Sequence, residues 1–215
     1  MSYFANGCNL RSLIRRASQN GYAYEHRALA EFARLRLLNE VRDLNFTRDD
    51  ISGEHVKQRI WRYSVRLPSE RLETLTALGR EISFVARKNS DYLPAAAEWR
   101  PNEATIQAYV GPTDGISPHR DHTRHVGLVA VFSLLGKGIV GIVRDRSGND
   151  LVEEIELRPR SLMLLRAPSS YGEDAATSER PMHYVMGPRE GEIRLSIGYR
   201  MDGRPDLPLA YSIDE

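Results

Sequence analysis

Two stretches in the N-terminal half of the chain carry apolar residues at helical spacing. Residues 26–44 and 69–88 each place an apolar residue every three or four positions, with charged residues between them. The apolar positions are Leu29, Phe32, Ala33, Leu35, Leu37, Leu38 and Val41 in the first stretch, and Leu72, Leu75, Leu78, Ile82 and Val85 in the second. This pattern predicts two amphipathic helices. The first twenty residues mix Gly, Asn, Ser and Arg, and we expect them to be loosely structured.

Short alternating or continuous apolar runs, separated by Gly and Pro, predict β-strands elsewhere. The predicted strands cover residues 56–67, 105–110, 126–135, 138–144, 153–157, 161–166 and 193–199. Turns are expected at 111–115 and 145–150, and a loop at 171–174. Many short strands of this kind are typical of a sandwich or jelly roll. The expected fold class is therefore α+β with a mainly β core, one sheet of which is buttressed by the N-terminal helices.

Composition adds few constraints. The chain has 215 residues, of which 41% are hydrophobic and 27% charged, with a formal net charge of +1. These values predict one globular domain and do not indicate a nucleic-acid binder by bulk charge. The single cysteine, Cys8, forms no intrachain disulfide and favours a reducing compartment. The polar start of the chain does not resemble a secretion signal, and no apolar run approaches the roughly 20 residues of a membrane span, so we expect a cytoplasmic protein.

The candidate chemistry centres on His119 and Asp121, which follow a turn-rich segment. Side chains two positions apart point the same way from a strand end. A distant histidine, His183, completes a set of two imidazoles and one carboxylate, which leaves about three positions open on Fe(II). His122 and His125 compete for the same role, although their spacing favours solvated or supporting positions. A chance pair and a structural histidine are the alternatives at this point.

Arg194 and Arg200 give those open positions a purpose. Their even separation places them on one face of the last predicted strand, with Ser196 and Gly198, while the apolar residues face the other side. If this face were interior, the two cations would require a paired anion. A dicarboxylate co-substrate would pair with both arginines, whereas a solvent-exposed face would need no partner.

Residues 98–201 resemble the AlkB-like branch of the Fe(II)/2-oxoglutarate-dependent dioxygenases. The resemblance rests on an ordered series of motifs: Gln107-x-Tyr109, the turn at Gly115, His119-x-Asp121, the strand ending at 132–136, His183, and Arg194-x5-Arg200. It implies a double-stranded β-helix (jelly-roll) core at 101–201. It also implies helical support and a substrate lid at 1–100, within a single domain covering 1–215.

The resemblance also implies roles for individual residues. His119, Asp121 and His183 would ligate Fe(II) as the catalytic centre. Arg194 and Tyr109 would bind the distal carboxylate of 2-oxoglutarate, and Arg200 would lie near its other carboxylate. Gln107 stands where many members carry Asn. The implied cofactors are Fe(II), the co-substrate 2-oxoglutarate, and O2.

The substrate is less well defined by the sequence. The implied activity is oxidative hydroxylation or demethylation of an N-alkylated nucleobase. Trp61 and Tyr63 lie in a basic segment and are candidates to stack the base beside phosphates; the equally favoured alternative is an edge strand whose aromatic side packs into the core. Thr123 departs from that family pattern, because nucleobase-repair members commonly carry an acid two residues past the metal-binding Asp. The alternatives are hydroxylation or demethylation of a protein side chain or small metabolite, a non-catalytic jelly-roll binding module, and a cupin-like Mn or Zn enzyme. We expect a monomer that binds alkylated nucleic acid or an anionic small molecule and no membrane.

Overall fold

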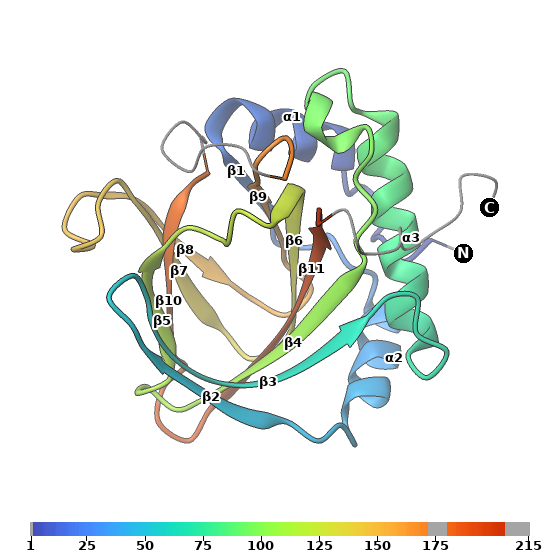
Figure 1. Ribbon diagram of the computed structural model, residues 1–215. Coiled ribbons are helices and arrows are strands. Elements are labelled where there is room, and N and C mark those ends of the chain that lie inside the picture. Colours follow the sequence, from blue (N-terminus) through green and yellow to red (C-terminus); the bar gives the residue numbers. More distant parts are fainter. Residues whose placement is uncertain (1, 172–179, 205–215) are drawn as a thin grey trace.

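The structure is a computed structural model that describes residues 2–171 and 180–204. Its described part forms one curled antiparallel sheet with helices on the outside (Figure 1). The helices are α1 (Leu10–Asn20), α2 (Glu31–Val41), α3 (Glu73–Lys88) and the 3₁₀ turn η1 (Pro94–Ala96). The strands are β1 (Tyr22–Glu25), β2 (Thr47–Ser52), β3 (Lys57–Arg66), β4 (Glu103–Val110), β5 (Gly115–His119), β6 (His125–Leu135), β7 (Gly138–Val143), β8 (Leu151–Leu157), β9 (Leu162–Arg166), β10 (Met182–Met186) and β11 (Ile193–Asp202).

The strand order is β1-β9-β6-β11-β4-β3-β5-β10-β7-β8, with β2 paired to β3 outside this path. The sheet bends so that β5, β10, β7 and β8 face β9, β6, β11 and β4 across the curl (Figure 1). This arrangement confirms the predicted mainly β, jelly-roll-like fold. The sheet also takes in β1 and β3, so its boundary does not coincide with the division at residue 100 that the resemblance implied.

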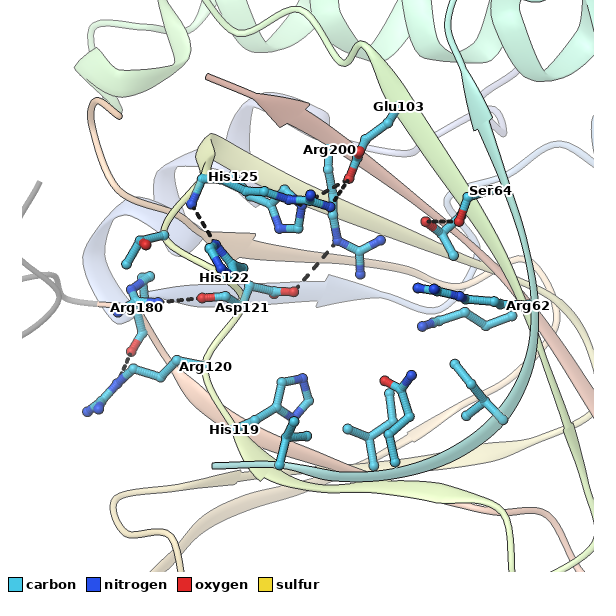
Figure 2. Close-up of a pocket in the computed structure, with 18 of the residues that line it drawn as sticks. Arg62, Ser64, Glu103, His119, Arg120, Asp121, His122, His125, Arg180 and Arg200 are labelled. Atoms are coloured by element: carbon cyan, nitrogen blue, oxygen red, sulfur yellow. Dashed lines mark hydrogen bonds and ion pairs between the residues drawn. The ribbon is translucent and has the colours of Figure 1, made fainter. Parts of the chain in front are cut away.

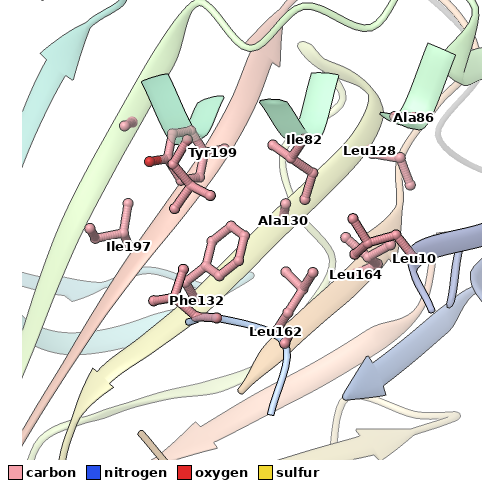
Figure 3. Close-up of a cluster of buried hydrophobic side chains, with 14 of the residues drawn as sticks. Leu10, Ile82, Ala86, Leu128, Ala130, Phe132, Leu162, Leu164, Ile197 and Tyr199 are labelled. Carbon is pink, nitrogen blue, oxygen red and sulfur yellow. The ribbon is translucent and has the colours of Figure 1, made fainter. Parts of the chain in front are cut away.

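Successive side chains of the central strands point to opposite faces of the sheet, and both faces are buried. On β6, Leu128, Ala130 and Phe132 point toward the helices, whereas Val129 and Val131 point into the curl. The outer core lies between the helices and the sheet and is the larger of the two (Figure 3). Because β6 is buried on both sides, its sequence reads as a continuous apolar run rather than an alternating one.

Specific hydrogen bonds hold the helices against this outer face. The Tyr199 hydroxyl on β11 donates to the Leu75 carbonyl of α3 at 2.8 Å. Glu40 of α2 accepts hydrogen bonds from the backbone N–H groups of Thr74 and Leu75 at 2.6 and 3.1 Å, at the start of α3. A carboxylate at a helix N-terminus satisfies donors that have no partner within the helix.

The predicted helices are confirmed with shorter bounds, and six elements were not predicted: α1, β1, β2, β5, β10 and η1. The loose N-terminus expected from composition is wrong: α1 buries Leu10, Leu13, Ile14 and Ala17, a helical spacing interrupted by polar residues. Strands β1, β2, β5 and β10 were also missed. Beyond Tyr171, the predicted loop at 171–174 lies outside the described residues. No helix in the described ranges has both the length and the apolar character required to cross a membrane.

Candidate functional site

The two histidines of the predicted ligand set meet on neighbouring strands. His119 ends β5, and the antiparallel register places it directly opposite His183 on β10. Their ring centroids are 4.3 Å apart. Strand pairing between segments more than sixty residues apart in sequence therefore brings the imidazoles together, as the ligand hypothesis requires.

Backbone carbonyls orient both rings. His119 Nδ1 lies 2.8 Å from the Ser117 carbonyl, and His183 Nδ1 lies 3.3 Å from the Pro181 carbonyl. A carbonyl oxygen only accepts, so each Nδ1 carries the proton and each Nε2 keeps its lone pair in the neutral ring. Burial, followed by the charge of His183, lowers the pKa of His119 to about 4. His119 is therefore neutral near pH 7, the form that binds metals.

Asp121 supplies the nearby carboxylate. Its Oδ2 is 4.0 Å from His183 Nε2, and its Oδ1 is 3.6 Å from Arg200 Nε. Burial opposes ionisation of this carboxyl, but Arg200 and the two histidines outweigh it and hold its pKa below the ordinary value. Arg180 fixes the backbone here by donating to the Asp121 carbonyl (Figure 2). Asp121 is thus an ionised oxygen donor beside the imidazole nitrogens of His119 and His183.

The three donors are close but do not form a finished ligand cage. Within residues 2–171 and 180–204, no three His, Cys, Asp or Glu side chains converge tightly enough to hold a metal ion. The Asp121 carboxylate is instead shared between Arg200 and His183. A metal would therefore bind only after these side chains draw together, although their chemistry suits Fe(II).

Arg194 of β11 is a cation buried in the interior of the curl. Only 1% of its surface is exposed, and its Nε and Nη1 atoms have no hydrogen-bond partner among the described residues. Its guanidinium lies 4.9 Å from the centre of the Tyr109 ring. Burial lowers the pKa of Arg194, with Tyr109 acting in the opposite direction. An interior cation of this kind is costly unless an anion pairs with it.

A small inner cavity connects this cation with the donor cluster. It has a volume of about 40 Å³ and is bounded by Arg194, Tyr109 and Gln107 together with His119, Asp121, His183 and Arg200. Its remaining walls are apolar: Ile116, Val131, Val140, Leu157, Met163, Leu165 and Val185. The Tyr109 hydroxyl donates to Gln107 Oε1 at 3.3 Å. The face prediction for β11 is confirmed, because Arg194 and Ser196 are buried on the side that bears Arg200.

Gly138 on β7 makes room for Arg194. A Cβ at this glycine would lie 2.2 Å from Arg194 Nε and 2.3 Å from its Cδ. Any side chain at position 138 would therefore displace the guanidinium. The sequence shows this glycine but gives no sign of its contact, which depends on β7 lying across the curl from β11.

The inner cavity lies beside a larger cleft of about 760 Å³ that reaches the surface (Figure 2). The two share Gln107, Ile116, His119, Asp121 and Arg200. The cleft is also lined by His122, Thr123 and His125, and by residues of β3. His125 contacts Glu103 Oε1 at 2.9 Å, and His122 accepts a hydrogen bond from the Arg124 backbone. These histidines therefore support the cleft wall, as their spacing suggested.

The two aromatic residues predicted to contact substrate do not line the cleft. Gln58, Ile60, Arg62 and Ser64 occupy the cleft face of β3, so the alternating Trp61 and Tyr63 point the other way. Tyr63 packs against the outer core, and Trp61 lies under the Arg48 guanidinium, 5.4 Å from it. Neither ring is therefore placed to stack a base within this cleft. Arg180 and Glu103 are cleft residues without a recognisable signal in the sequence, whereas Arg62 belongs to the basic segment around Trp61 and Tyr63.

Comparisons with known proteins agree on the fold. No protein-family model matches the chain, and no curated protein matches its sequence. A prolyl-4-hydroxylase from Pseudomonas putida superposes with a TM-score of 0.64 at 14% identity, covering 89% of this chain and 98% of that one. SnoN, a non-haem α-ketoglutarate-dependent epimerase of nogalamycin biosynthesis, gives 0.61 at 17% identity, covering 94% and 91%.

A third solved structure is a Trichoplax adhaerens prolyl hydroxylase in complex with a peptide of hypoxia inducible factor. It gives a TM-score of 0.59 at 13% identity, covering 90% of this chain and 89% of that one. Identities this low establish a shared fold. None of the three is described as AlkB-like, so membership of that branch stays a prediction.

Proposed function

We propose that this chain is a single-domain, monomeric Fe(II)- and 2-oxoglutarate-dependent oxygenase. The observation that carries the proposal is Arg194, a buried cation with two unpartnered nitrogens beside a cavity that also contains His119, Asp121 and His183. A dicarboxylate with one end at Arg194 and the other at the donor cluster satisfies both groups. A structural role for the buried arginine would require an internal carboxylate partner, and the described residues provide none within 4 Å.

Each residue has a distinct task in this proposal. His119, Asp121 and His183 hold the iron, as two neutral nitrogen donors and one carboxylate. Arg194 and Tyr109 bind the distal carboxylate of 2-oxoglutarate, and Arg200 and Gln107 face its other end. The loaded metal supplies oxidation of a substrate C–H bond by O2. The apolar walls of the inner cavity exclude water from the dicarboxylate, which strengthens its pairing with Arg194.

Arg200 contributes charge control beside the metal site. With Nε 3.6 Å from Asp121, it keeps that carboxyl ionised and ready to bind a cation. When a keto acid carboxylate enters, the same guanidinium becomes its neighbour. Arg200 therefore stabilises the Asp121 carboxylate before 2-oxoglutarate binds, and the keto acid carboxylate of 2-oxoglutarate afterwards.

The substrate has two candidate classes. Demethylation of an N-alkylated nucleobase draws support from the arginines of the cleft, which suit a phosphate backbone. Hydroxylation or demethylation of a small molecule or protein side chain is favoured by the cleft wall, whose described residues include no Phe, Tyr or Trp on which a base could stack. We therefore propose the second class and keep the first as an arm of the test.

A non-catalytic binding module and a cupin-like Mn or Zn enzyme are the competing functions. Neither needs an unpaired arginine behind the donor cluster. Anaerobic addition of Fe(II) and 2-oxoglutarate tests the oxygenase proposal through the visible charge-transfer band of a keto acid chelated to iron. Absence of the band, with iron demonstrably bound, would refute the proposal.

Two variants test the ligand assignment. Asp121→Ala should abolish iron-dependent succinate release, whereas His122→Ala should retain it, because His122 hydrogen-bonds the Arg124 backbone instead of facing the donors. Succinate release measured with N-methylated oligonucleotides and with a panel of metabolites and peptides then identifies the substrate class. An inactive His122→Ala with an active Asp121→Ala would show that the ligand set is wrong.

A further inference from the structure

We propose that the cleft selects a small anionic substrate and that Arg62 binds its carboxylate or phosphate group. This inference rests on the proposed function, because it places the anion opposite the metal ligands. Arg62 lies on the cleft face of β3, and its side chain points across the cleft toward the wall that carries His119 and Asp121 (Figure 2). It is therefore placed to contact a molecule held above the donor cluster.

Arg62 has unused hydrogen-bonding capacity. Among the described residues its only ionic partner is Asp49, whose Oδ2 lies 2.9 Å from Nε. Neither of its Nη groups has a hydrogen-bond partner there. A guanidinium presents donors in a planar fork that matches the two oxygens of a carboxylate or phosphate. The free edge of Arg62 therefore fits an oxyanion entering from the cleft.

The rest of the lining has the same sign. Seven arginines and only two carboxylates, Glu103 and Asp121, line the cleft in the part of the chain that the structure describes. Arg120 and Arg146 each donate to a backbone carbonyl, and neither has a carboxylate within ion-pair distance there. The whole chain carries a formal charge of only +1, so the concentration of cations is local to this cleft. Clefts lined by one sign of charge raise the local concentration of the opposite ion.

The size and chemistry of the cleft favour a small molecule over nucleic acid. A volume of about 760 Å³ lies within the range of small-molecule sites. The imidazoles are the only aromatic rings among the described lining residues, so a flipped base would lack the usual stacking partners. The cleft therefore favours a small oxyanion, and preferential binding of nucleic acid would overturn the inference.

Calorimetric titration of the protein with inorganic phosphate and with acetate tests the inference without turnover. Arg62→Gln should weaken binding of the preferred anion about tenfold, as expected for a lost charge-assisted contact. Asp49→Asn should tighten it several-fold, because the competing carboxylate is removed. Preference for phosphate or for acetate tells which oxyanion the substrate carries.

Arg59→Gln is the matched control. Arg59 is on the same strand, is 58% exposed against 49% for Arg62, and also lies near an aspartate, Asp114, at 3.7 Å. It occupies the opposite face of β3 and does not line the cleft. Anion affinity should stay within about twofold in this variant. Equal losses in Arg59→Gln and Arg62→Gln would mean diffuse charge attraction and would overturn the inference, as would no loss in Arg62→Gln.

Two further measurements separate this inference from the proposed function. Arg194→Gln should abolish 2-oxoglutarate binding to the Fe(II)-loaded protein under anaerobic conditions and leave the Arg62-dependent part of the phosphate or acetate affinity intact. Retained 2-oxoglutarate binding in Arg194→Gln would refute the proposed function alone. Loss of the small-anion affinity in Arg194→Gln would overturn the inference, as would an Arg62-dependent affinity for a single-stranded oligonucleotide without affinity for phosphate or acetate.

Discussion

Replacing Arg194 by Met should stabilise the ligand-free protein and abolish its binding of 2-oxoglutarate. Arg194 is 1% exposed, and two of its nitrogens have no partner among the described residues. Each buried unsatisfied donor costs about 1–3 kcal/mol. The ring of Tyr109, 4.9 Å away, returns about 1–2 kcal/mol as a cation–π contact. An apolar side chain of similar length removes both terms. Two donors at about 1–3 kcal/mol each, less the cation–π contact, leave a net gain of up to about 5 kcal/mol.

The same substitution should act in the opposite direction on ligand binding. Breaking a buried, hydrogen-bonded charge pair costs about 2–5 kcal/mol, which is roughly a thirty-fold to several-thousand-fold loss of affinity. Denaturant unfolding without ligand measures the first effect, and anaerobic calorimetry with Fe(II) and 2-oxoglutarate measures the second. Arg158→Met is the control, because Arg158 is exposed and pairs with Glu156 at 2.6 Å outside both cavities.

Opposite signs in the two assays are the signature of a residue kept for its ligand rather than for the fold. A destabilised Arg194→Met protein with unchanged 2-oxoglutarate affinity would refute the reasoning. It would mean that the guanidinium has a structural partner in the folded protein.

Three further predictions follow from the same geometry. Gly138→Ala should displace the Arg194 guanidinium, because the new Cβ would lie 2.2 Å from Nε. Calorimetry should then show 2-oxoglutarate binding weakened by about tenfold or more. Gly53→Ala, where a Cβ meets only ordinary contacts, should leave 2-oxoglutarate binding unchanged. The free energy of unfolding of the metal-free protein should fall by up to about 3 kcal/mol as the pH is lowered from 6.5 to about 4. The reason is that His119 becomes protonated in the unfolded chain over this range but stays neutral in the folded protein. Denaturant unfolding should show a smaller loss in His119→Gln. Glu40→Ala should lower the free energy of unfolding by about 0.5–2 kcal/mol through loss of the two hydrogen bonds that cap α3, with iron binding unchanged.

The sequence predicted most of the sheet because strand periodicity is a local signal. The even spacing of Arg194 and Arg200 also predicted their common face, and burial of Arg194 confirms that this face is interior. Strand β10 was missed because it is only five residues long, and its pairing with β5 and β7 is non-local. The helical spacing of α1 was present in the sequence but was obscured by its Arg, Ser and Asn residues.

The sequence predicted the candidate site less well where a residue's role depends on which face of its strand points inward. Trp61 and Tyr63 alternate with Arg62, and periodicity alone did not decide which set faces the cleft. The contact of Gly138 with Arg194 and the shared carboxylate of Asp121 depend on strands that meet across the curl. Such contacts are products of topology and leave no local pattern.

The two faces of strand β11 have different roles. Ile197 and Tyr199 pack against the helices in the outer core, whereas Arg194 and Arg200 on the other face line the inner cavity. A substitution on this strand therefore affects one purpose at a time, but a single-residue insertion or deletion exchanges them. It would turn guanidinium groups into the helix-covered core and aliphatic side chains toward the metal donors. This segment should therefore tolerate point changes far better than any change in its length.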